Sequence, residues 1–131
     1  MSTRAQIVVV LASEAALYAT YTGHDAAFHW FTHLLVGALA ALSLMTARTL
    51  RTRRPASSPL LQILFWHVVA MLPDLLFIGG IPHQPWMDVF LGHVSSHFVP
   101  GRNLTWLGLV AATSAAAAIV QREAQDASTP T

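Results

Sequence analysis

Four apolar stretches separated by short polar breaks set the pattern of this chain. They cover about residues 5–22, 26–47, 60–80 and 104–120. Each is close to the roughly 20 residues that a helix needs to cross the hydrocarbon core of a bilayer. The pattern predicts an all-α polytopic membrane protein, in which residues 1–131 form a single transmembrane domain with four membrane-spanning helices.

The first apolar stretch allows a second interpretation. Arg4 followed by a hydrophobic run is also typical of a cleaved signal peptide. Glu14 inside the run, and the lack of a clear small-x-small cleavage site, favour a retained helix instead.

The basic residues predict the orientation of the four spans. All seven are arginines, and four of them fall in the loop 48–59: Arg48, Arg51, Arg53 and Arg54. Positively charged loops stay in the cytoplasm, so this loop and both chain termini, including the polar tail 121–131, are predicted to be cytoplasmic. Arg4 and Arg122 then lie on the same side, and Arg102 alone lies outside. The expected location is the bacterial inner membrane.

Composition agrees with a membrane protein. Apolar residues make up 54% of the chain and charged residues only 10%, and the mean hydropathy is +0.52. The chain has no cysteine, which excludes disulfides, iron–sulfur clusters and haem attached through CxxCH. We expect membrane lipid as a partner and no nucleic acid.

A polar segment between the last two spans carries the candidate chemistry. His93 and His97 stand four residues apart, so on a helix both imidazoles would leave the same face, as in zinc-binding HxxxH patterns. Pro82 and Pro85 should prevent one straight helix through the whole segment. We predict a short re-entrant or interfacial helix at about residues 86–99.

Ionisable residues in the spans fall at one depth. At about 1.5 Å of rise per residue, Glu14, the His29/His33 pair and Asp74 all lie at a similar level of the outer leaflet. An ionised Asp inside a membrane costs on the order of 2.5–3.5 kcal/mol, and a divalent cation bound by imidazoles and carboxylates offsets such a cost. Pro73 should kink the third span beside Asp74.

These observations predict a metal site, with zinc as the expected ion, near the extracytoplasmic face. The predicted ligands are His33, Asp74, His93 and His97, with His29 and His83 as further candidates. Glu14 or Asp88 is the candidate general base. For His67 the sequence leaves three roles open: a ligand, a residue that supports a ligand, or a packing residue.

Three motifs along the chain resemble a known family. They are Thr32-His33 with Gly37, Leu72-Pro73-Asp74, and His93-Val-Ser-Ser-His97. In this order, over roughly residues 28–101, they resemble the small bacterial inner-membrane proteins described as membrane-bound metal-dependent hydrolases. That family usually continues the Pro-Asp with a further Asp and His, where this chain has Leu75-Leu76-Phe77. The resemblance implies a metal-dependent hydrolase. Whether its site holds one metal ion or two stays open.

Three functions compete at this point. The first is a metal-dependent hydrolase that acts on a lipid or lipid-linked substrate. The second is a b-type haem protein with axial histidines such as His33 and His97. The third is a non-catalytic accessory subunit, or a conduit for protons or metal ions. The sequence leaves a homo-oligomer open in each case.

Overall fold

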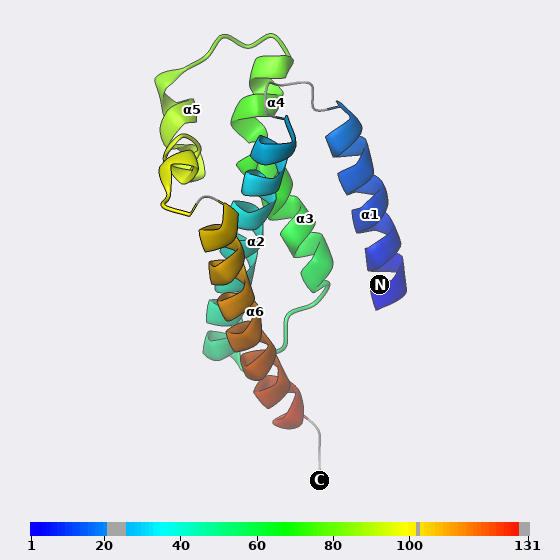
Figure 1. The fold of residues 1–131 in the computed structure, drawn as a ribbon. Helices are drawn as coiled ribbons and strands as arrows, with labels where there is room; N and C mark the ends of the chain where they lie inside the picture. The colour runs from blue at the N-terminus through cyan, green and yellow to red at the C-terminus, as the bar shows by residue number, and fades with distance from the viewer. Residues whose placement is uncertain (21–25, 102, 129–131) are drawn as a thin grey trace.

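The computed structural model describes residues 1–20, 26–101 and 103–128, and this part of the chain is helical without any strand (Figure 1). Arg102, the one arginine predicted to lie outside, is not among the described residues. The elements in chain order are α1 (Thr3–Thr20), α2 (Ala26–Thr52), α3 (Pro59–Ala70), α4 (Leu72–Ile78), α5 (Pro85–Val89), the 3-10 helices η1 (Phe90–Gly92) and η2 (Ser95–Phe98), and α6 (Asn103–Asp126). The all-α prediction is confirmed.

Helix α2 is the centre of the structure. It packs against both α3 and α6, whereas α1 lies at the edge of the bundle and mainly contacts α3 (Figure 1). The buried core between α2 and α6 consists of Ala41, Leu42 and Met45 from α2 and Ala117 from α6. Because two of these side chains are alanines, the two helix backbones can approach closely.

Gly37 marks the closest approach of α2 to α3. A Cβ atom added at this position would lie 2.6 Å from both the Cα and the backbone N of His67. Backbone atoms cannot move aside as a flexible side chain can, so only glycine fits here. The contact places His67 directly over α2 and leaves its side chain wholly buried.

The third predicted span is broken in two. α3 ends at Ala70, α4 begins at Leu72, and the two axes differ by 53°. Pro73 stands in the first turn of α4, where its missing N–H cannot continue the hydrogen-bond ladder of α3. The predicted kink beside Asp74 is therefore present, and it turns α4 away from the line of α3.

Among the described residues, fewer helices qualify as membrane spans than the four predicted. His29–Thr52 and Asn103–Asp126 are each long and apolar enough to cross a membrane, and α3 with α4 makes a third if the bent pair counts as one span. Helix α1 is not among these candidates, and it carries Arg4, Gln6 and Glu14 among its apolar residues. Two to three candidate spans are consistent with a membrane protein.

The single helix predicted over residues 86–99 is wrong in detail. The segment instead forms α5, η1 and η2, with a turn at His93 and Val94. The break falls at Leu91 and Gly92, whose φ angles of 46° and 69° are left-handed and incompatible with a continuing α-helix. His93 and His97 therefore do not share one helical face.

The Gly37 contact generates the first prediction. Gly37→Ala should force α2 and α3 apart and lower the free energy of unfolding by about 1–3 kcal/mol, the usual range for overpacking. Thermal denaturation of the purified protein in a mild detergent measures this loss. Gly108→Ala on α6 is the matched control, because an added Cβ there meets nothing within 4 Å; it should leave the melting temperature unchanged or raise it. Equal effects of the two variants would contradict the assigned contact.

Candidate metal centre

Two groups of potential ligands meet at one end of the bundle. His29, His33 and His97 form one group, and His33, Asp74 and His93 form the other. Within each group, ligand atoms from the three side chains lie within 4.8 Å of one another. His33 belongs to both groups, so five residues from α2, α4 and the 90–98 segment gather around it.

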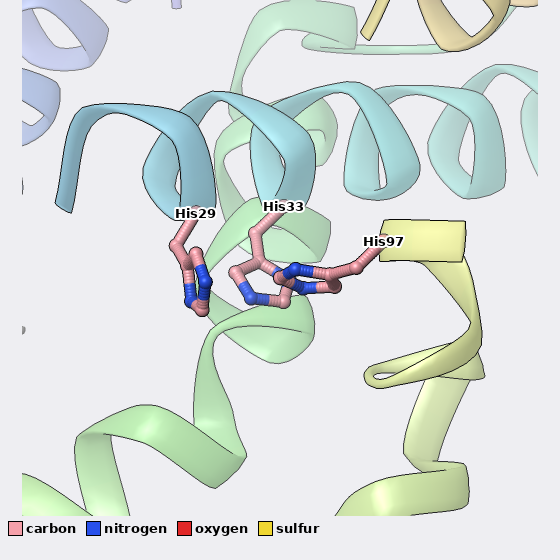
Figure 2. Close-up of side chains that lie close together, drawn as sticks. All are labelled: His29, His33 and His97. Carbon is pink, nitrogen blue, oxygen red and sulfur yellow. The ribbon is translucent and has the colours of Figure 1, made fainter. Parts of the chain in front are cut away.

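Figure 2 shows how the first group is assembled: His29 and His33 extend from consecutive turns of α2, and His97 reaches toward them from η2. The ring centroids of His29 and His97 are 4.4 Å apart, and those of His33 and His97 are 5.9 Å apart. The four-residue spacing of His29 and His33 produces this arrangement, because it places both side chains on one face of α2.

The carboxylate of Asp74 organises the second group. Its Oδ2 lies 3.1 Å from Nε2 of His33, and its Oδ1 lies 3.3 Å from Nε2 of His93. The two imidazole rings are stacked, with centroids 4.8 Å apart and planes within 5° of parallel. One carboxylate thus faces two parallel imidazoles, each through a different oxygen.

The contact between His33 and Asp74 is close without being a hydrogen bond. Nε2 of His33 is buried and has no aligned hydrogen-bond partner among the described residues, although Oδ2 lies only 3.1 Å away. Nδ1 of His93 is likewise buried without a partner in this part of the chain. Two ligands on one tetrahedral zinc ion, with bonds of about 2.0 Å, stand about 3.3 Å apart. The observed separations match that value, so the residues fit a divalent cation.

A cavity of about 200 Å³ opens beside the two groups. Its lining residues are His29, His93, Val94, His97 and Phe98. Burial, followed by the neighbouring His29, His33 and His93, lowers the pKa of His97 to about 4, while Asp74 acts in the opposite direction. His97 is therefore neutral at neutral pH, and the neutral imidazole is the form that ligates metals.

Helix α6 holds the irregular segment in place. The indole N–H of Trp106 donates a hydrogen bond of 3.0 Å to the backbone carbonyl of Ser96 in η2. The hydroxyl of Thr32, next to His33, donates one of 2.7 Å to Oδ1 of Asn103 at the start of α6. The sequence contains no signal for these contacts: Trp106 looks like any aromatic anchor at a membrane interface, and Thr32 and Asn103 are far apart along the chain.

Glu14, one of the two candidate bases, lies elsewhere. Its Oε1 is 2.9 Å from Nδ1 of the wholly buried His67, and the rings of Trp30 and His67 form a T-shaped pair with centroids 5.5 Å apart. Neither Glu14 nor His67 belongs to the two ligand groups. Because α1 packs mainly against α3, the carboxylate of Glu14 meets His67 rather than His33.

Asp88 and His83 also lie apart from the ligand groups. Oδ1 of Asp88 is 2.9 Å from Nε2 of His83, and the two side chains are 44% and 56% exposed. These two residues pair with each other in the α4–α5 connection and the short helix α5. The structure thus brings five of the eight predicted site residues together and leaves Glu14, His83 and Asp88 outside.

Comparison with known proteins adds no family to this geometry. The chain matches no protein-family model, no curated protein and no solved structure. The resemblance to membrane-bound metal-dependent hydrolases stays a prediction from the motifs.

The Glu14–His67 pair generates the second prediction. Glu14→Ala leaves a buried imidazole without its partner, so the free energy of unfolding should fall by about 1–3 kcal/mol. Denaturation in mixed detergents measures the change, with the exposed Glu123→Ala as the matched control, expected within about 0.5 kcal/mol of the wild type. In a double-mutant cycle, adding His67→Ala to Glu14→Ala should cost clearly less than His67→Ala alone. Strictly additive effects would show that the pair contributes nothing.

Proposed function

We propose that this protein is a membrane-embedded metal-dependent hydrolase whose ion, zinc, is held by His33, Asp74 and His93. One observation carries the proposal: these three side chains come from three separate segments of the chain, and their donor atoms lie within 4.8 Å of one another. One of these atoms is the buried Nε2 of His33. His29 and His97 complete the surroundings of the ion on the side of the cavity.

A bound cation accounts for this arrangement better than an ion pair does. A polar atom buried without a partner costs free energy, and Nε2 of His33 is in that position. An ion pair between His33 and Asp74 would gain most from an aligned N–H, which is missing here although the atoms are 3.1 Å apart. Lone pairs directed at a common centre explain both the short distance and the poor alignment.

Each ligand has a definite task in this proposal. Asp74 supplies the negative charge and, by facing both imidazoles, fixes the orientation of the His33 and His93 rings. His29 and His97 line the cavity where a substrate would enter. Zinc held by these three residues would act as a Lewis acid and would lower the pKa of a bound water to about 7.

The walls of the cavity favour an amphiphilic substrate, such as a lipid or a lipid-linked ester. Val94 and Phe98 lie beside the imidazoles, and 79% of Phe98 is exposed. Val89, on the preceding α5, is 75% exposed. An acyl chain covering these side chains would remove apolar surface from water while its ester reaches the histidines. In this proposal this end of the protein lies at the extracytoplasmic face of a bacterial inner membrane, the orientation that the arginine distribution favours.

Haem binding is the weaker candidate. A haem between His33 and His97 needs a flat apolar slot between the two rings. The carboxylate of Asp74 and the imidazoles of His29 and His93 crowd that neighbourhood instead.

The third prediction tests the metal centre directly. Full-length protein purified in detergent should contain zinc at about one ion per chain by elemental analysis. His33→Ala, Asp74→Asn and His93→Ala should each lower the zinc affinity by tenfold or more, on the order of the effect seen when a ligand or its support is lost. His83→Ala and Asp88→Asn are the matched controls, because this exposed pair lies outside the cluster, and both should keep full zinc content.

Activity separates the hydrolase from a metal site with another role. Hydrolysis of a long-chain nitrophenyl ester in mixed micelles should disappear on chelation and return with added zinc. If the wild type binds zinc and the three variants lose it, but neither the ester nor phospholipid is hydrolysed, the proposed hydrolase activity is overturned and the metal site stands. Equal zinc content in the cluster variants and the controls would overturn both.

A further inference from the structure

A second polar cavity lies at the opposite end of the bundle. It has a volume of about 310 Å³ and is lined by Arg48, Thr52, Arg54, Pro55 and Ser57. These residues come from the last turns of α2 and from the loop between α2 and α3. In Figure 1 this loop lies at the end of the bundle farthest from α5, so the cavity is remote from the histidine cluster.

The loop that forms this cavity is held in a defined conformation. Arg53 and Ser58 adopt left-handed φ angles of 54° and 52°, which non-glycine residues rarely do. The backbone N–H of Ala56 donates a 2.6 Å hydrogen bond to Oε1 of Gln121 on α6. Nε2 of Gln121 in turn donates one of 2.9 Å to the hydroxyl of the buried Thr49. The cavity wall is thus fixed to α2 and α6 before any ligand arrives.

The cavity concentrates positive charge. Four of the seven residues from 48 to 54 are arginines, and two of them line the cavity. Within the described part of the chain, none of the four forms an ion pair with a carboxylate. The C-terminal end of α2 contributes only about half a negative charge, so the cavity stays strongly positive. Like charges that line one cavity repel one another, and an anion bound between them relieves that repulsion.

We propose that this cavity binds a phosphate group. The planar guanidinium groups of Arg48 and Arg54 can each donate two parallel hydrogen bonds to phosphate oxygens. Thr52 and Ser57 add hydroxyl groups to the same wall, and that of Thr52 already donates a 2.8 Å hydrogen bond to the backbone carbonyl of Arg48. The phosphate could belong to the head group of an anionic phospholipid or be free in solution. This inference does not depend on the proposed hydrolase.

The surface of α2 favours the lipid. Leu44 lies one helical turn before Arg48, on the same face, and is 50% exposed. If α2 crosses a membrane, an acyl chain can run along Leu44 while its phosphate occupies the cavity. If the arginines served only to orient the protein in a membrane, they would have to lie in the loop, but two of them would not have to line one cavity.

The experiment compares arginines inside and beside the cavity. Full-length protein in detergent is titrated with phosphatidylglycerol or phosphatidylcholine of identical acyl chains, and bound lipid is counted by native mass spectrometry. Inorganic phosphate is titrated in parallel by calorimetry. The test variants are Arg48→Gln and Arg54→Gln. The matched controls are Arg51→Gln and Arg53→Gln, which remove the same charge from the same cluster without touching the cavity wall.

We expect each test variant to weaken binding about tenfold, the effect of losing a charge-assisted contact, and each control to change it less than about threefold. All four arginines are exposed, so none of the substitutions disturbs the core. Preferential binding of phosphatidylglycerol with this pattern identifies a head-group site; the same pattern with inorganic phosphate identifies a site for the free ion. Equal losses in tests and controls, or no preference for either anion over phosphatidylcholine, would overturn the proposal.

Discussion

The structure depends on how an apolar bundle accommodates ionisable side chains. Each such group, if left alone among apolar helices, would cost several kcal/mol or lose its charge. In this protein three histidines meet carboxylates from other segments: His33 and His93 meet Asp74, and the buried His67 meets Glu14. These contacts connect α1 to α3 and α2 to α4, so the polar groups also determine which helices lie together.

Gly37 controls where these polar contacts can form. By bringing the backbones of α2 and α3 into contact at His67, it fixes the height of α3 relative to His33, one turn away on α2. The break before Pro73 then redirects α4, so that Asp74 faces His33 and His93. A larger side chain at position 37 would displace α3 and, with it, both His67 and Asp74.

Much of this arrangement could be predicted from the sequence. The helical class, the kink at Pro73 and the gathering of His33, Asp74, His93 and His97 all follow from spacing, proline chemistry and depth. Depth, however, does not tell which way a side chain points around its helix axis. Glu14, which the sequence predicts at the level of His33, faces His67 instead. Asp88 meets His83 because a short connection brings the two together. The periodicity of apolar residues does not predict such a contact.

The break at Leu91 and Gly92 is a feature of the site that the sequence does not predict. On one continuous helix, His93 and His97 would project in the same direction and offer two nitrogens to one side of an ion. Because the segment turns between them, His93 instead stacks on His33 next to Asp74, while His97 packs against His29. The two histidines therefore reach His33 from different directions, and His33 becomes common to both ligand groups. An irregular backbone surrounds the buried nitrogen of His33 more completely than a regular helix could, and the hydrogen bond from Trp106 to Ser96 holds that backbone in place.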